Sequence, residues 1–360
     1  MANKTARLGD LATYINGYAF KPADWGDTGL PIIRIQDLTG NSYQLNRYDG
    51  EYPERIEVND GDVLISWSAS LGVYVWQRGK ALLNQHIFKV VFDKLPVNKE
   101  YFVFAVEHKL AEMESKTHGA TMKHIVKKDF DGTTIPYPPI EKQAEIADHL
   151  RRITSLIDKQ TEQLLLLDQL VKSRFIELFG DPETNPKGWT RQRLDQICEN
   201  LDSRRVPITS TNRKAGNYPY YGASGIVDYV KDYIFDEDIL LISEDGANLV
   251  MRSTPIAFSV SGKVWVNNHA HVVRFESKAT QKYIEICFAL TDISGSITGT
   301  AQPKLNQAKL NAMMFCVPPI ELQEQFATFV EQTDKSKLAV QKGLQELEIL
   351  KKSLMQQYFG

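Results

Sequence analysis

The chain has 360 residues, of which 42% are hydrophobic and 24% are charged, and its formal net charge at pH 7 is −3. This length exceeds what one hydrophobic core usually holds, so we expect two domains of roughly 100 to 200 residues each, and the composition is typical of globular rather than disordered proteins. The small net charge excludes neither nucleic acid nor a small acidic ligand, because binding depends on how charge is distributed.

The three cysteines, Cys198, Cys287 and Cys316, are scattered and lack CxxC spacing. This pattern gives little support to a disulfide framework or a zinc site, so we expect reduced core residues and no metal or other cofactor. Residues 1–10 lack the apolar segment of an export signal, and no run of 18 apolar residues occurs. We therefore expect a cytoplasmic protein that does not insert into a membrane.

The first part of the chain predicts a mixed domain. Runs of β-branched and aromatic residues, separated by Gly, Asp and Asn turns, indicate strands at residues 30–35, 63–67 and 87–92, and a helix follows at 99–114.

A long helix is predicted at residues 141–179. Pro138 and Pro139 suit its start, and Gly180 followed by Pro182 suits its end. At 1.5 Å per residue it would run roughly 58 Å, which is too long to fold into either globular half. Its residues at steps of four and three form a heptad seam: Ile146, Leu150, Ile153, Ile157, Gln160, Leu164, Leu167 and Val171.

The second part of the chain predicts strands at residues 239–243, 256–260 and 271–275 and a helix at 281–291. A second seam follows, formed by Phe326, Val330, Thr333, Lys337, Val340, Leu344, Leu347 and Lys351. Three of these core positions are polar, which predicts looser packing. One such stripe could belong to an amphipathic helix on its own domain, but two favour pairing with each other as an antiparallel coiled coil.

The chain is also internally duplicated. Pro-Pro-Ile-Glu-x-Gln occurs at residues 138–143 and 318–323, and the Phe-Gly pairs at 179–180 and 359–360 keep the same offset of 180 residues. Upstream, Asn84-Gln85-His86 resembles Asn267-Asn268-His269, and Gly119 faces Gly299. The sequence thus predicts an α+β fold in which two mixed α/β domains are separated by two long helices, with an internal pseudo-twofold repeat.

This layout resembles a known family. Two mixed domains, each followed by Pro-Pro-Ile-Glu-x-Gln and a long helix, with Phe-Gly-Asp-Pro at 179–182 and Asn-Pro-Lys-Gly-Trp at 185–189, resemble the specificity subunit of type I restriction-modification systems. The resemblance covers essentially the whole chain and implies target-recognition domains at 1–137 and 189–317, spacer helices at 138–180 and 318–360, and a linker at 181–188.

The resemblance also implies function. Each domain would read one half of a bipartite, interrupted site in double-stranded DNA, and the helices would dock two methyltransferase subunits, which restriction and translocase subunits join. The chain itself would not be an enzyme, and it carries no GxxxxGK[ST] loop and no recognisable glycine-rich cofactor loop.

Two features that could suggest catalysis are better explained structurally. Glu276-Ser277-Lys278 has the Glu-x-Lys form of metal-dependent nucleases, but this short pattern is common by chance, and it follows a predicted strand at a surface turn. His86 and His269 recur in equivalent places, but neither has a carboxylate and a nucleophile at informative spacing, so structural hydrogen bonding is expected.

DNA contact calls for basic and amide side chains on loops. In the first half the candidates are Arg34, Gln36, Ser68 and Ser70 beside Trp67, Lys116, Lys123, His124 and Lys127. In the second half they are Arg204, Arg205, Arg213, Lys214, Tyr221, Ser224, Gln302, Lys304 and Asn306. Any one of them is equally compatible with a solvated surface residue, and it is the clusters that favour DNA. The paired segments 119–123 and 299–304 are favoured most.

Two alternatives remain open at this point. The chain could serve DNA recognition in an orphan or fused methylase system, which would change its partners, or it could be a structural coiled-coil scaffold. Tight binding to an interrupted duplex would exclude the scaffold, and methylation only after a separate subunit is added would exclude the stand-alone system.

Overall fold

The structure is a computed structural model that describes residues 4–41, 45–116, 125–299 and 301–360. The chain forms two compact units, one made of Met1–Thr161 with Lys342–Gly360 and the other of Glu162–Gln341. Two 40-residue helices, α5 (Ile140–Phe179) and α10 (Ile320–Phe359), each contribute to both units. The predicted long helices are therefore confirmed, the first beginning one residue earlier than expected.

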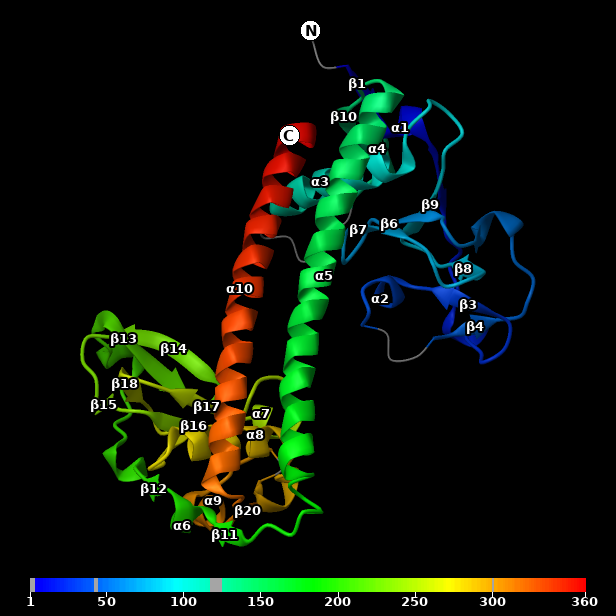
Figure 1. The fold of residues 1–360 in the computed structure, drawn as a ribbon. Helices are drawn as coiled ribbons and strands as arrows, with labels where there is room; N and C mark the ends of the chain where they lie inside the picture. The colour runs from blue at the N-terminus through cyan, green and yellow to red at the C-terminus, as the bar shows by residue number, and fades with distance from the viewer. Residues whose placement is uncertain (1–3, 42–44, 117–124, 300) are drawn as a thin grey trace. The chain divides into compact units, whose positions relative to one another are not determined.

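The strands of the first unit form three small sheets (Figure 1). One sheet has the order β2-β9-β6-β7, the second has the order β4-β3-β8-β5, and β1 pairs with β10. The strands are β1 (Thr5–Arg7), β2 (Thr13–Asn16), β3 (Leu30–Ile33), β4 (Arg47–Tyr48), β5 (Glu57–Val58), β6 (Val63–Ser66), β7 (Gly72–Val75), β8 (Ala81–Leu83), β9 (Ile87–Val91) and β10 (Thr134–Pro136). The helices are α1 (Leu8–Leu11), α2 (Ile35–Leu38), α3 (Lys99–Lys116) and α4 (Lys127–Gly132).

The second unit repeats this arrangement. Its sheets have the orders β12-β19-β16-β17 and β14-β13-β18-β15, and β11 pairs with β20. The strands are β11 (Arg191–Arg193), β12 (Glu199–Asn200), β13 (Ala215–Gly222), β14 (Gly225–Val230), β15 (Phe235–Asp236), β16 (Ile239–Ser243), β17 (Ala257–Val260), β18 (Lys263–Val266), β19 (Ala270–Arg274) and β20 (Met314–Cys316). The helices are α6 (Leu194–Ile197), α7 (Asn248–Met251), α8 (Lys278–Leu290) and α9 (Gln307–Ala312).

Strand directions repeat as well as strand order. In each unit the first four-stranded sheet is wholly antiparallel, and the second contains one parallel pair, β3 with β8 or β13 with β18. The one-turn helices α1 and α6 occupy the same place in the two halves. The duplication seen in the sequence is thus a duplication of topology.

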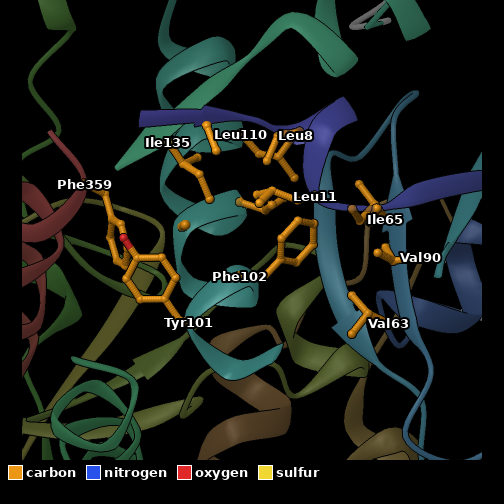
Figure 2. Close-up of a cluster of buried hydrophobic side chains, with 14 of the residues drawn as sticks. Leu8, Leu11, Val63, Ile65, Val90, Tyr101, Phe102, Leu110, Ile135 and Phe359 are labelled. Carbon is orange, nitrogen blue, oxygen red and sulfur yellow. The ribbon is translucent and has the colours of Figure 1, made fainter. Parts of the chain in front are cut away.

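The core of the first unit lies between α3 and the β2-β9-β6-β7 sheet. Figure 2 shows Phe102 and Leu110 of α3 beside Leu11 and Ile65, all of them buried. The end of α10 joins this core, because the Phe359 ring lies 5.2 Å from the Tyr101 ring. Residues at opposite ends of the sequence therefore share one hydrophobic cluster, which packs the end of α10 onto this domain.

The second unit has an equivalent core with an aromatic centre. Phe175 and Phe179 from the end of α5 contact Tyr283 of α8 and Phe326 of α10, with ring centroids 4.8 to 5.5 Å apart. All four side chains are almost fully buried. The last turns of α5 are thus packed on the second domain, as the last turns of α10 are packed on the first.

Within each unit the segments of α5 and α10 run antiparallel. In the first unit His149 approaches Tyr358, with Nδ1 and the hydroxyl 3.4 Å apart, whereas Gln160 lies next to Gly343. In the second unit Asp168 pairs with Lys337 at 2.6 Å, and Phe175 contacts Phe326. As residue numbers rise along α5, those of the contacting residues on α10 fall. The predicted antiparallel pairing is therefore confirmed within each unit.

Every predicted seam position is buried or half-buried. The polar positions of the second seam find partners. The Thr333 hydroxyl donates to the Phe329 carbonyl, and Lys351 lies 3.5 Å from Glu107 and over the Phe104 ring. With the Lys337–Asp168 pair, each polar residue of the second seam has a specific contact, whereas Gln160 of the first seam has a buried side-chain oxygen without a hydrogen-bond partner in the described part of the chain.

Helix α5 ends where a glycine is required. Gly180 has a φ of 77°, and a Cβ there would lie 2.6 Å from the Pro186 side chain. The next turn closes on the helix end, because the Trp189 indole N–H donates to the Phe179 carbonyl at 2.9 Å. A side chain other than glycine would be strained by both backbone and packing.

Candidate nucleic-acid interface

In the first unit, three loops meet just after the end of β6, an inner strand of its sheet. The residue after β6, Trp67, donates its backbone N–H to the His86 carbonyl at 3.3 Å, and its own carbonyl accepts from the Ile125 N–H at 3.0 Å. It therefore ties the β6–β7 loop to the β8–β9 loop and to the segment that precedes α4. We call this arrangement the three-loop junction.

The second unit builds the same junction after β16. The Glu244 N–H donates to the His269 carbonyl at 2.9 Å, and the Glu244 carbonyl accepts from the Leu305 N–H at 2.8 Å. Glu244 thus stands where Trp67 stands in the first unit, and Leu305 follows Ile125 by 180 residues. The segment before α9, within which Gln302 and Lys304 lie, is held at this point.

The last residue of each central strand, β6 and β16, is a serine that bonds a loop, the β6–β7 loop in the first unit and the β13–β14 turn in the second. The buried Ser66 hydroxyl donates to the Ser70 carbonyl, and the buried Ser243 hydroxyl donates to the Ala223 carbonyl, both at 2.5 Å. These bonds fold the neighbouring loops, which carry Ser70 and Ser224, against the junction. Ser70 and Ser224 are exposed.

The junction of the first unit is aromatic. The Trp67 ring stacks on Phe88 of β9 at 5.5 Å and meets the His86 ring edge-on at 5.0 Å. Ala69 has a φ of 59°, and His86 has a φ of 71°. Side chains other than glycine rarely adopt this backbone conformation, so the surrounding packing must hold both loops in place.

The junction of the second unit is ionic. Glu244 accepts from the Arg205 guanidinium at 2.6 Å and lies 3.0 Å from the Lys304 ammonium. Asp202 accepts from the His271 ring at 2.6 Å and from the Val272 amide at 2.8 Å. The His271 side chain is 1% exposed and that of Asp202 5% exposed, so these charges are largely removed from water.

The electrostatic consequences follow from these contacts. Burial acts to raise the pKa of Asp202, but the hydrogen bonds from His271 and Val272 and the charge of Arg205 outweigh it, and its pKa is lowered. Burial likewise acts to raise the pKa of Glu244, but hydrogen bonds from Arg205 and Lys304 lower it. Both carboxyl groups are therefore ionised near neutral pH.

The structural hydrogen bonding expected of the histidines is seen for His269, whose Nδ1 lies 2.9 Å from the Asp245 carboxylate. The two residues are 24 positions apart in the sequence and meet only because the β16–β17 and β18–β19 loops pack together. His86 differs, because its Nδ1 is buried without a hydrogen-bond partner in the described part of the chain.

The remaining candidates of the first half lie in several places. Arg34 contacts Asp37 at 3.4 Å and lies over the Trp25 ring, and Gln36 is exposed on α2. Lys127 pairs with Asp131 at 2.7 Å on α4. The segment 119–123, which includes Lys123, lies outside the described residues. So do His124 and the side chain of Lys116.

In the second half the candidates separate into two groups. Arg205, Ser224, Gln302 and Lys304 lie on the segments that the junction holds, with Gln302 and Lys304 exposed. Elsewhere, Arg204 pairs with Glu237 at 2.7 Å, and Arg213 pairs with Asp228 at 3.2 Å. Lys214 is exposed and Tyr221 lies against Phe258, whereas Asn306 caps α9 by accepting from the Lys309 N–H.

Sequence reasoning did not select Asp202, Glu244 or His271. The available signal was a histidine inside an apolar strand together with acidic residues at the ends of neighbouring elements. The Glu-x-Lys pattern is placed as expected, at the turn between β19 and α8, where Ser277 caps the helix and Lys278 pairs with Asp238.

The described residues contain no group of three or more His, Cys, Asp or Glu placed to hold a metal ion. The cysteines are free thiols, two of them buried. Among helices in the described ranges, none is long and apolar enough to cross a membrane.

Comparison with known proteins places the chain in a family. The family model described as type I restriction modification DNA specificity domain matches residues 2–167 and again residues 186–349. The chain therefore belongs to this family and carries its domain twice. Each match combines one globular part with most of the long helix that follows it.

Individual proteins that the chain resembles are also type I specificity subunits. The MjaVIII type I restriction enzyme specificity subunit of Methanocaldococcus jannaschii is 23% identical over 98% of this chain and 91% of its own length. The EcoBI specificity subunit of Escherichia coli is 29% identical over 46% of this chain, a match that spans 35% of that relative. The crystal structure of a type I restriction-modification S subunit from M. genitalium has the same fold, with a TM-score of 0.60 at 15% identity over 99% of this chain and 96% of that one.

Proposed function

We propose that the chain is the DNA-recognising subunit of a type I restriction-modification complex and that it reads a bipartite, interrupted site in double-stranded DNA. The observation that carries this proposal is the three-loop junction, built twice on one topology with different side chains. A common scaffold that presents different loops is what two readers of different half-sites require.

The proposal assigns residues 1–137 and 189–317 to the two readers, 138–180 and 318–360 to the spacer helices, and 181–188 to the linker. In the second reader, Gln302 supplies an amide for base edges and Lys304 a charge for phosphate, because both are exposed on the segment that the junction holds. In the first reader, the exposed Ser70 and the half-buried Ser68 lie on the loop that follows Trp67.

We further propose that the chemistry belongs to partner subunits. Three leucines on α5 are exposed although they lie on a helix whose other face is packed: Leu165 (66%), Leu166 (56%) and Leu170 (47%). Exposed apolar residues that gather on one element mark protein interfaces. They support docking of a methyltransferase subunit. The proposed complex has two such subunits, which restriction subunits join in the cytoplasm.

The test is reconstitution on a library of randomised duplexes, with the chain alone, the modification subunits alone, and both together. We expect methylation only in the combined reaction, confined to duplexes that share two short motifs at a constant gap. Methyl transfer by the chain alone would contradict the division of labour, and would favour the orphan or fused methylase. Failure to select any duplex would favour the scaffold.

A matched pair of lysine variants locates the interface. Lys304→Ala and Lys278→Ala each remove an exposed lysine that pairs with one carboxylate, at 3.0 and 2.7 Å. Lys304→Ala should weaken binding to all duplexes and reduce the salt dependence by about one counterion, whereas Lys278→Ala should leave both unchanged. Equal effects of the two variants would contradict the placement of the interface.

A further inference from the structure

The buried His271 of β19 makes a hydrogen bond through each ring nitrogen. Nδ1 lies 2.6 Å from the Asp202 carboxylate, and Nε2 lies 2.8 Å from the Leu305 backbone carbonyl. The ring thus joins β19 to the segment at Asp202 and to the segment that leads into α9. That second segment carries Gln302 and Lys304.

The hydrogen-bond chemistry of these contacts determines where the protons are. A backbone carbonyl can only accept, so Nε2 must carry a hydrogen. The Asp202 carboxylate already accepts from the Val272 amide and lies 3.4 Å from the Arg205 guanidinium, both of which favour its ionised form. An ionised carboxylate also only accepts, so Nδ1 carries a hydrogen as well. Both hydrogen bonds of the His271 ring thus form only when each ring nitrogen carries a hydrogen.

The charges around the imidazolium come from each segment packed on it. Asp202 and Arg205 lie on the segment after β12, and Glu244, after β16, has a carboxylate oxygen 3.8 Å from His271 Nδ1. Lys304 reaches the same Glu244 side chain from the segment before α9. Loss of the proton from His271 would leave the two carboxylates with one cation fewer, and one of the two ring hydrogen bonds could no longer form.

The first unit provides an internal comparison. In the strand pairing, Phe88 lies opposite Ile65, and His271 lies opposite Ile242, so Phe88 and His271 are equivalent. Phe88 stacks on Trp67, which is equivalent to Glu244. The same two positions thus hold their junction with apolar rings in one unit and with ions in the other.

We propose that His271 is a positioning residue of the second reader, whose imidazolium holds the segment 301–306 in the conformation that presents Gln302 and Lys304 to DNA. This role rests on the proposed function. The protonated ring makes both hydrogen bonds, so the positioning is present at low pH and is lost as pH rises. Recognition of the second half-site weakens with rising pH, and recognition of the first does not.

The first measurement needs no DNA. In the full chain labelled with ¹⁵N-histidine, long-range ¹H–¹⁵N correlation at pH 6 should show His271 protonated on both ring nitrogens, with the signal assigned by its absence in His271→Gln. Hydrogen exchange, corrected for intrinsic rates, should show the Thr298, Lys304 and Leu305 amides, which donate to backbone carbonyls, losing protection between pH 6 and pH 8.5. His271→Gln should reduce their protection already at pH 6, whereas His149→Gln, which changes an exposed histidine on α5 in the other unit, should not.

The second measurement uses duplexes selected at pH 6 and then scrambled in one half-site at a time. Discrimination at the second half-site should fall about tenfold across this pH range, which corresponds to one charge-assisted hydrogen bond, while discrimination at the first stays constant. His271→Gln should abolish the pH dependence.

The outcomes separate the two proposals. A neutral His271 at pH 6, or loop protection that changes with neither pH nor His271→Gln, overturns the positioning role. If no duplex binds at any pH, the proposed DNA recognition fails, while protonation and loop protection still decide what His271 does. If His271→Gln does not fold, the wild-type pH series decides alone.

Discussion

Single residues set the character of each domain by filling equivalent positions with different chemistry. Trp67 and Phe88 stack in one unit, and Glu244 and His271 take part in an ion network in the other. The cysteines are another residue-scale feature, because burial, with a smaller contribution from Asp195, raises the pKa of Cys198 to about 12. Burial also raises the pKa of Cys287.

The thiols should therefore be inert in the folded protein. Because the thiolate is the reactive form, the raised pKa leaves far fewer Cys198 side chains reactive at pH 8 in the native state than the roughly one quarter expected in the unfolded chain. We expect alkylation by iodoacetamide at pH 8 to be at least a hundredfold slower in buffer than in urea, followed by mass spectrometry of the Cys198 peptide. Equal rates in buffer and in urea would contradict the raised pKa of Cys198.

At the scale of elements, the long helices carry the clearest pattern. Their seam positions are buried or half-buried throughout, including Lys337 and Lys351, whose ammonium groups reach carboxylates. Polar seam residues were expected to loosen the pairing. The partners of these two lysines are acidic side chains on other helices, Asp168 on α5 and Glu107 on α3, which a heptad count does not reveal.

The helices can be tested as the ruler between half-sites. Asp168 faces Lys337 and Gln160 faces Gly343, so Leu164 and Val340 lie at corresponding points of the antiparallel pair. One heptad inserted after each residue would lengthen both helices by roughly 10 Å and preserve the seam, which is about three base pairs of B-DNA. The preferred gap should grow by about that amount while both half-site motifs stay the same, as measured by duplex selection.

A single insertion after Leu164 is the control. It leaves α10 unchanged, so part of the insert should loop out and the gap should change less. A gap that stays fixed in the double insertion, with folding and binding intact, would mean that the helices do not set the spacing.

At the scale of the whole molecule, each unit has its own cores and its own sheets. Replacing residues 1–137 with the corresponding domain of another family member should therefore change one half-site motif and leave the other, and the gap, unaltered. Duplex selection with the exchanged chain measures this. A change in both motifs would contradict one reader per domain, and the reciprocal exchange of residues 189–317 is the matched control.

Sequence by itself determined the elements that depend on local pattern. The heptad seams, the proline and glycine at the helix ends and the offset of 180 residues were sufficient for α5, α10 and the duplication, because helix periodicity and backbone restrictions act over a few residues. The six strands that were predicted lie within one or two residues of their expected ranges, from β16, which matches, to β3, which ends two residues early, whereas the other strands, such as β13 and β14, were not predicted.

Only the tertiary structure decided which loops meet. Asp202, Glu244 and His271 are separated by tens of residues and come together because β12, β16 and β19 are neighbours in one sheet. The hydrogen-bond partners of the His271 ring are a carboxylate and a carbonyl supplied by two distant segments, so no local pattern encodes them. A side chain's ionisation reflects the groups that surround it in space, whereas a helix reflects its neighbours along the chain.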